Sequence, residues 1–226
     1  MPDTAHAVPP EAPKNCPLCP RLVSFRETNQ ETYPDYFNGA VPSFAPKDGD
    51  DAVELLVIGL APGLQGANKT GRPFTGDYAG DLLYSTLTHF GFANDKYDAR
   101  PDDGFALQRT MITNAIRCVP PENKPTGAEA NACRPFLVSR LSSLPKLKVM
   151  ICLGKISHDN TLRALGLKLS AHPFGHGTEY AVEGPNGVPL TLLSSYHCSR
   201  YNTNTGRLTE EMFHDVFERA IEVLGG

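Results

Sequence analysis

The chain of 226 residues lacks any apolar run near the length of about 18 residues that a membrane-spanning helix needs. This excludes an integral membrane protein of helical type, and we expect no membrane partner. Residues 1–15 carry no apolar segment of the secretory kind, so we expect no signal peptide and a cytoplasmic location. Basic residues are not in excess either, because 21 Lys and Arg face 25 Asp and Glu. A net charge of −4 argues against a protein that binds nucleic acid over its whole surface.

The composition allows one substantial hydrophobic core, or at most two small domains, because 40% of the residues are hydrophobic and 20% are charged. No internal repeat or low-complexity tract is present. Residues 1–15 are rich in Pro and Ala without periodicity, which predicts a flexible N-terminal tail. We expect a single domain over residues 16–226 and a monomer.

The negative charge is confined to the first part of the chain. Residues 1–51 hold 4 basic and 8 acidic residues, which leaves 17 of each for the rest. Within this balanced part, residues 62–72, 114–125 and 196–208 together hold six basic residues and one acidic residue, Glu122. If these three segments meet in space, they form a positive patch.

Four short apolar runs predict buried strands. They are mostly continuous rather than alternating, which is typical of strands buried on both faces of a parallel sheet. Helical patterns separate them, and one begins at a capping box of Thr126 and Glu129, although Pro135 predicts a kink or restart within it. We therefore predict an α/β fold, a three-layer α/β/α domain with a central, mainly parallel, four-stranded sheet. The runs are Val53–Gly59, Thr110–Arg117, Leu147–Leu153 and Val188–Ser195.

Open sheets of this class bind their ligands outside the carboxyl ends of the strands. That rule points to the loops after Gly59, over residues 114–123, at Gly154-Lys155 and over residues 196–208. Three of these loops overlap the positive segments, so the patch and the ligand site are expected to coincide.

Four cysteines have the spacing of a metal site. Cys16 and Cys19 form a CxxC pair, and Cys118 and Cys133 flank the predicted end of a strand and a helix. Four thiolates suit either Zn²⁺ or a [4Fe–4S] cluster, and the spacing does not choose between them. The alternative is that these are small buried apolar residues. Cys152 lies inside an apolar run and is interpreted as core.

The loop over residues 59–77 is rich in glycine, which indicates a backbone that approaches a ligand closely. It matches neither the GxGxxG nor the Walker pattern, so it gives little support for nucleotide binding. Its cations, ring and carboxylate could hold a phosphodiester, stack a base and perform acid–base work. Alternatively, Asp77 caps the following helix. The polar side chains are those of Lys69, Arg72 and Asp77, and the ring is that of Phe74.

The segment that follows the last predicted strand is dense in hydrogen-bond donors and has no acidic residue. Ser195–Arg207 carries hydroxyls, amides and two arginines, which suits contacts to a phosphate backbone. His197 lies where the sheet would deliver a ligand contact, although an isolated histidine is commonly structural.

Three stretches resemble the motifs of the uracil-DNA glycosylase superfamily. They are GLAPGLQGANKTGRPFTGD at residues 59–77, TNAIRC at 113–118 and SYHCSRYNTNTGRLT at 195–209. The long first motif, with no acidic residue directly after GLAP, is most similar to the family 5 (type B) enzymes of bacteria and archaea. The cysteine pattern also resembles the four [4Fe–4S] ligands shared by families 4 and 5.

The resemblance implies a uracil-DNA-glycosylase-like fold and a DNA repair enzyme that hydrolyses the N-glycosidic bond of uracil in double-stranded or single-stranded DNA. The implied range extends to other altered bases such as hypoxanthine, xanthine and ethenocytosine. It implies catalytic roles for Asp77 and His197, base binding by Phe74, Asn114, Ala61 and Gly63, DNA contacts from Lys69, Arg72, Ser199, Arg200 and Asn202, and a [4Fe–4S] cluster on Cys16, Cys19, Cys118 and Cys133.

The implied mechanism gives each side chain a separate task. Phe74 stacks on the flipped base and Asn114 reads its polar edge, with Asn123 as a second candidate for that reading. His197 stabilises the anion of the leaving base. Asp77 favours the sugar cation or positions the attacking water. The vacated base stack is filled by one of two neighbouring residues, Arg200 or Tyr201.

One residue departs from the pattern, because Cys198 occupies the place where this motif usually has proline. Loss of the fixed φ of proline could loosen the loop around His197, while inert packing is the simpler interpretation of the thiol. Two other functions stay open on the sequence. One is a non-catalytic iron–sulfur protein that senses or scaffolds DNA, and the other is a zinc-stapled nucleotide-binding domain.

Overall fold

The computed structural model describes residues 8–185 and 187–225, and it is built around one five-stranded sheet with the strand order β2-β1-β3-β5-β4. Strands β2, β1, β3 and β5 pair in parallel, and β4 pairs antiparallel with β5. The prediction of a mainly parallel sheet is confirmed, but the number of strands was wrong. The strands are β1 (Leu55–Gly59), β2 (Thr110–Asn114), β3 (Val149–Leu153), β4 (Glu179–Glu183) and β5 (Pro189–Ser195).

The missed strand is β4, and the exposure of its side chains explains why it was missed. Only Val182 of its five residues is buried, so the segment EYAVE has no apolar run. The four predicted strands, by contrast, are apolar because helices cover both of their faces. An edge strand is defined here by its partner β5 rather than by its own sequence.

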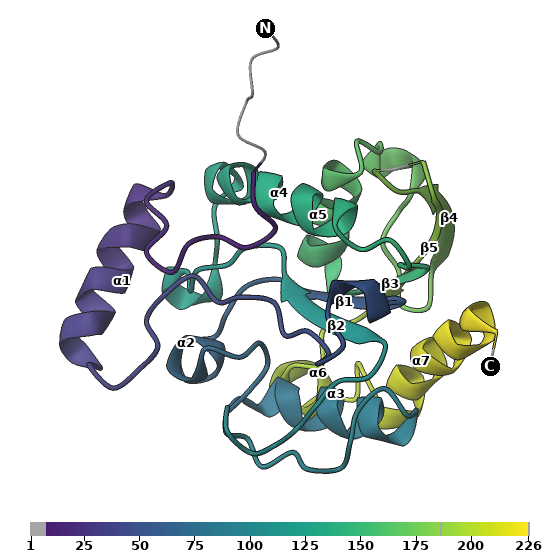
Figure 1. The fold of residues 1–226 in the computed structure, drawn as a ribbon, viewed down its shortest axis with the longest axis horizontal. Coiled ribbons are helices and arrows are strands. Elements are labelled where there is room, and N and C mark those ends of the chain that lie inside the picture. The colour runs from purple at the N-terminus through teal and green to yellow at the C-terminus, as the bar shows by residue number, and fades with distance from the viewer. Residues whose placement is uncertain (1–7, 186, 226) are drawn as a thin grey trace, which may run out of the picture.

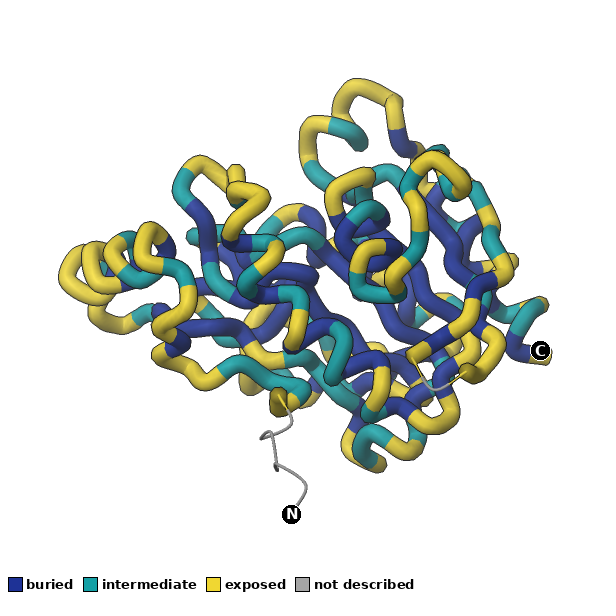
Figure 2. Tube along the Cα trace, turned by 90° about the horizontal axis from the view of Figure 1, so that it is seen from above, coloured by how far each residue is buried: buried dark blue, intermediate teal, exposed yellow. Residues whose placement is uncertain are grey.

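Helices cover both faces of the sheet and produce three layers (Figure 1). Alternate strand residues such as Leu55 and Val57 pack against α3 and α7, whereas Leu56 and Ile58 pack against α4 and α5. Figure 2 shows the strands as the buried centre of the molecule. The α-helices are α1 (Pro20–Thr32), α2 (Ala67–Thr70), α3 (Tyr78–His89), α4 (Gly127–Ser142), α5 (Lys155–Ala164), α6 (Arg200–Asn204) and α7 (Glu210–Leu224), and the 3-10 helices are η1 (Asp50–Ala52), η2 (Pro121–Asn123) and η3 (Leu169–Ala171).

The helix that was expected to kink or restart at Pro135 does not restart there. The capping box at its start is present, since Thr126 Oγ1 accepts from the Glu129 amide and the Glu129 carboxylate accepts from the Thr126 amide. Residues on both sides of Pro135 belong to the single helix α4. Pro135 lies on the exposed side of that helix, where the backbone carbonyl that loses its partner can be hydrated.

The flexibility predicted for residues 1–15 stays a prediction, but the part of this segment that the structure describes contacts the domain. Residues 1–7 lie outside the described part of the chain, but residues 8–15 pack on the domain. The Glu11 carboxylate bridges Arg117 and Arg140, with 3.1 Å between Glu11 Oε2 and Arg117 Nη1. The Val8 carbonyl accepts from Ser139 Oγ. Composition did not reveal this, because the two arginines that hold Glu11 lie more than a hundred residues away.

Among the residues that the structure describes, no helix has the length and apolar character to cross a membrane. The parallel strands β1, β2, β3 and β5 end at one edge of the sheet, where the loops singled out in the sequence come together.

Candidate active site

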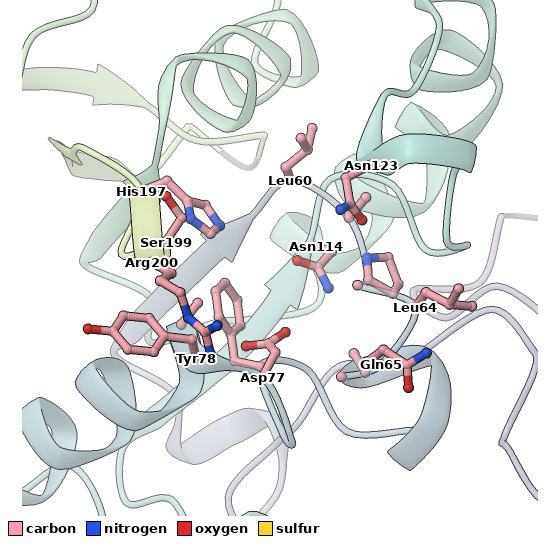
Figure 3. Close-up of a pocket in the computed structure, with 17 residues that line it drawn as sticks. Leu60, Leu64, Gln65, Asp77, Tyr78, Asn114, Asn123, His197, Ser199 and Arg200 are labelled. Carbon is pink, nitrogen blue, oxygen red and sulfur yellow. The ribbon is translucent and has the colours of Figure 1, made fainter. Parts of the chain in front are cut away.

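A pocket of about 500 Å³ opens at the carboxyl edge of the sheet, between the ends of β1, β2 and β5 (Figure 3). Segments far apart in the sequence supply its walls, and each of the three positive segments contributes. The lining residues are Leu60–Ala67, Phe74, Asp77–Ala79, Asn114, Asn123, His197, Ser199 and Arg200. The predicted site residues Ala61, Gly63, Phe74, Asp77, Asn114, His197, Ser199 and Arg200 are therefore together in one place.

Asp77 lies at the floor of the pocket, and it is also the N-cap of α3. Its Oδ1 accepts from the Gly80 amide at 3.1 Å, so the capping alternative is correct and compatible with a place in the pocket. Its Oδ2 lies over two glycines of the loop after β1. A Cβ on Gly66 would lie 2.4 Å from that oxygen, and one on Gly63 would lie 3.4 Å from it. Burial raises the pKa of Asp77, while the Gly80 and Ala79 amides oppose the rise.

Phe74 and Asn114 meet across Gly59. A Cβ on Gly59 would lie 2.3 Å from Asn114 Oδ1 and 2.7 Å from Phe74 Cζ, so only glycine leaves room for both side chains. The Asn114 side chain makes no hydrogen bond to any part of the chain that the structure describes, and it faces the pocket (Figure 3). Phe74 has a φ of 55°, a left-handed conformation that costs free energy in a non-glycine residue.

His197 closes the opposite wall of the pocket, directly after β5 (Figure 3). Its ring lies 6.0 Å from the Phe74 ring, with an interplanar angle of 27°. Burial lowers its pKa to about 4, so the imidazole is neutral at neutral pH. Within the described residues its ring makes no hydrogen bond, while its backbone carbonyl accepts from Asn202 Nδ2 at 2.8 Å. The ring nitrogens are thus available to a ligand.

The rim beside His197 is formed by the start of α6. Ser199 caps this helix by accepting from the Asn202 amide, and Asn202 in turn holds the His197 backbone. The Arg200 guanidinium lies 5.1 Å from the centre of the Tyr78 ring, above the entrance. Tyr201 is the most exposed of the large apolar side chains, at 71%. Lys69 is exposed on α2, with its ammonium 5.5 Å from the Tyr36 ring.

Two of the six basic residues of the expected positive patch are not on the surface. Arg72 was expected at the DNA strand, but its side chain is buried and forms a bidentate ion pair with Asp103. Arg117 is buried against Glu11 and Ser43. Both guanidiniums are already neutralised inside the protein, so neither can contact a phosphate group. The patch is smaller than the charge count predicted.

The four cysteines of the predicted metal site line a separate, apolar pocket between α1 and α4. Cys16 and Cys133 are buried, and Cys19 and Cys118 are partly exposed. Cys133 Sγ accepts from the Arg117 amide at 3.3 Å, the type of hydrogen bond that tunes cluster sulfurs. Burial and the neighbouring thiols raise the pKa of Cys118 to about 12, although the nearby Arg26 guanidinium opposes the rise.

The four cysteines are of the donor type that a [4Fe–4S] cluster or Zn²⁺ takes, and they line one apolar pocket. Among the described residues, no group of three His, Cys, Asp or Glu side chains converges closely enough to hold a metal ion. The type of donor therefore fits an iron–sulfur cluster, and the geometry does not choose between the two groups.

Sequence reasoning missed several residues that line or support the pocket. Gln65 and Tyr78 lie within or next to the glycine-rich motif, and their position there was the signal that could have found them. Asp103 belongs to an Asp-rich run that gave no sign of its role, because its partner is 31 residues away. Asn123, the second candidate for reading the base, does line the pocket.

The fold and the pocket together define a three-layer α/β/α protein with a pocket at the carboxyl edge of a mainly parallel sheet. Residues 46–221 match the sequence model of the uracil DNA glycosylase superfamily. The chain is 43% identical to the type-5 uracil-DNA glycosylase of Thermus thermophilus, over 93% of this chain and 94% of that protein. The chain therefore belongs to the uracil-DNA glycosylase superfamily.

Two further relatives show that the chain is more similar in sequence to type-5 than to type-4 uracil-DNA glycosylases. A type-5 uracil-DNA glycosylase of Pyrobaculum aerophilum is 36% identical over 91% of this chain and 88% of its own length. A type-4 uracil-DNA glycosylase of the same organism is 31% identical, over 81% and 78%. The resemblance to family 5 that the motifs indicated is confirmed.

Proposed function

We propose that this chain is a DNA repair hydrolase that flips uracil out of DNA and cleaves its N-glycosidic bond. The observation that carries the proposal is the convergence of Phe74, Asn114, Asp77 and His197 on one pocket. Each of the four has a free face or atom toward the pocket, and none is consumed in an internal ion pair. Membership of the superfamily supports the same activity.

The base would enter between a ring and an amide. Flipping removes the base from the stack at a cost of a few kcal/mol, which contacts in the pocket must offset. Phe74 offers a rigid ring for stacking, and Asn114 offers one donor and one acceptor beside it. Because an amide can donate or accept, Asn114 can pair with more than one base edge. This supports a range that includes hypoxanthine and xanthine besides uracil.

Cleavage places negative charge on the base and positive charge on the sugar. Neutral His197 would donate a hydrogen bond to the base oxygen, and this bond strengthens as the anion forms. Neutral imidazole can fill this role because one of its two ring nitrogens still carries a proton that can be donated in a hydrogen bond. Asp77, as a carboxylate, would stabilise the sugar cation or orient the attacking water.

The DNA strand would lie along the rim formed by α6 and the loop before it. This rim carries Ser199, Arg200 and Asn202. Lys69 is exposed on α2, within the segment that follows β1. Phosphate contacts of this kind fix the register of the strand rather than the choice of base. Tyr201 or Arg200 would fill the vacated stack, and the exposed ring of Tyr201 supports that residue as the better candidate.

The four cysteines would hold a [4Fe–4S] cluster. The ligands are Cys16, Cys19, Cys118 and Cys133. When bound, the cluster would supply a cross-link among three segments of the chain, and the proposed base chemistry uses none of its electrons. Cys118 is four residues beyond Asn114, so the cross-link would also fix the end of β2.

The test is base release from labelled DNA duplexes that carry uracil, hypoxanthine, xanthine or no lesion, with alkali used to reveal abasic sites. Asp77→Asn keeps an oxygen acceptor for the Gly80 amide and removes the charge. Asp81→Asn, on the exposed face of α3, is the matched control. Cleavage by the wild type that Asp77→Asn loses and Asp81→Asn retains would support the proposal.

The outcomes also separate the alternatives. Release of uracil alone would restrict the range. DNA binding without release, by protein that contains iron, would support the non-catalytic sensor or scaffold. Elemental analysis that finds zinc in place of iron and sulfide would contradict the cluster and support the zinc-stapled alternative.

A further inference from the structure

The buried ion pair of Arg72 and Asp103 does not line the pocket, but it packs beside the loop that carries Phe74. The side chains are 7% and 0% exposed, with 2.9 Å from Nη1 to Oδ1 and 2.7 Å from Nη2 to Oδ2. Four aromatic rings lie 5.1 to 5.9 Å from the guanidinium carbon: those of Phe44, Tyr84, Tyr97 and Phe105. A charge pair in such surroundings has strong geometric demands, because each partner depends on the other for its solvation.

Arg72 holds the residue after Phe74, and Tyr84 and Thr75 hold the residue before it. Arg72 Nε donates to Thr75 Oγ1 at 2.6 Å, which fixes the residue after Phe74. The Tyr84 hydroxyl donates to the carbonyl of Pro73, the residue before it, and lies within 3.2 Å of Thr75 Oγ1. The four groups form one network around a three-residue turn.

Phe74 needs this support because its backbone is strained. Its φ of 55° is unfavourable for a side chain with a Cβ, and such strain persists only where the surroundings impose it. Its carbonyl oxygen is pressed against α3, where a Cβ on Gly80 would lie 1.8 Å from it. A relaxed turn at φ below zero would point the ring in another direction. The position of the ring beside His197 therefore depends on the network.

We propose that Asp103 is a positioning residue for the base-stacking ring: by holding Arg72, it keeps the turn of Phe74 in the left-handed conformation that aims the ring into the pocket. The inference rests on the proposed function. It also gives a structural role to one residue of the Asp-rich segment over residues 94–104. Asp103 is the member of that segment that turns inward, and the Phe105 and Asp98 amides donate to its carboxylate at 2.9 and 3.0 Å.

The experiment is a double-mutant cycle on single-turnover release of uracil by the full chain. Asp103→Asn should lower the rate by about ten- to a hundredfold, as expected for a misplaced group that binds the base. Asp102→Asn is the matched control, because that carboxylate is 79% exposed and has only a 4.0 Å contact to Arg100. In a Phe74→Leu background, Asp103→Asn should change the rate by less than about twofold, since no ring is left to position.

The loss of thermal stability distinguishes positioning from general damage. Asp103→Asn should lower Tm by the same amount in both backgrounds, because the buried charge of Arg72 is unpaired in each. An equal fold loss of rate in the two backgrounds would overturn the inference. Tyr84→Phe is a milder second variant, which removes only the hydroxyl that holds Pro73. It should give a smaller loss of rate that also disappears with Phe74→Leu.

A second measurement needs no activity. The aromatic NMR resonances of Phe74, assigned by their absence in Phe74→Leu, should shift or broaden in Asp103→Asn and remain in place in Asp102→Asn. Unchanged resonances in Asp103→Asn would overturn the inference even if the protein released no base. Absence of uracil release from the wild type, with resonances that do respond, would contradict the proposed function and leave the positioning role standing.

Discussion

The pocket and the cysteine site are only four residues apart at Asn114 and Cys118, yet their polar groups are in opposite states. In the pocket, the Asn114 amide and the His197 ring make no hydrogen bonds within the described chain. Beside the cysteines, the Arg117 guanidinium is bonded to Glu11 and Ser43, and its amide donates to Cys133. A site that acts on a ligand keeps donors and acceptors available, whereas a site that holds segments together uses them internally.

The backbone shows the same contrast. Around the pocket, glycines at positions 59, 66 and 80 permit approaches that no other residue allows, and Phe74 is strained. Around the cysteines, apolar residues of α1 and α4 such as Leu22 and Phe136 form a small core of their own. Changes in the first region should therefore alter activity more than stability, and changes in the second should do the reverse.

The largest effect is expected for Asp77→Asn. Loss of the carboxylate charge should reduce single-turnover release of uracil by roughly a thousandfold, the order expected for a positioned acid–base group. The retained cap to Gly80 should hold Tm within about 3 °C of the wild type. Rate assays and thermal melts on the same samples check this. A large fall in Tm would show that Asp77 is mainly structural.

Cys118→Ser should have the opposite profile. The variant should lose bound iron and sulfide, and Tm should fall by roughly 10 °C or more, because binding energy at such a site is folding energy. Release of uracil per folded molecule should persist at low temperature. Elemental analysis and thermal melts check the prediction. Cys152→Ser is the control, because Cys152 is a buried cysteine that is not one of the four proposed ligands. Full iron content in Cys118→Ser would contradict the assignment of Cys118 as a ligand.

Protonation of His197 should also be visible in stability. Its pKa is about 4 when folded, against an ordinary value of 6.5. Between pH 6.5 and pH 4 the unfolded chain takes up a proton that the folded chain does not, so the free energy of unfolding falls as pH falls, by roughly 3 kcal/mol in all. Urea titrations at several pH values across this range should show that the free energy of unfolding depends less steeply on pH in His197→Asn than in the wild type. An identical slope in the variant would contradict the burial of a neutral ring.

The smallest effect is expected for Cys198→Pro, which restores the usual residue of the motif. Cys198 is fully buried in the core beneath the pocket, with Sγ 3.4 Å from the Ala79 carbonyl, and burial raises its pKa. The thiol is thus packed rather than reactive, and proline is similar in volume. Uracil release should change by less than about twofold. A large loss of activity with normal folding would show that the loop needs cysteine.

Much of the architecture could be predicted from local patterns. The four parallel strands are apolar because both of their faces are covered, and Thr126 with Glu129 marks the start of α4. The edge strand β4 could not be predicted, because its residues alternate in exposure without an apolar run. The packing of residues 8–15 was also hidden, since it depends on Glu11 meeting two distant arginines.

Local sequence patterns were enough to predict the class of fold, the edge of the sheet where the site lies, and the residue types that gather there. Which charged side chains face a ligand depends on tertiary contacts and could not be predicted in this way. Arg72 and Lys69 look alike in the sequence, yet Arg72 is neutralised by Asp103, 31 positions away, and Lys69 stays exposed. The physical reason is that burial of a charge is decided by its partner in space, and no local pattern carries that partner.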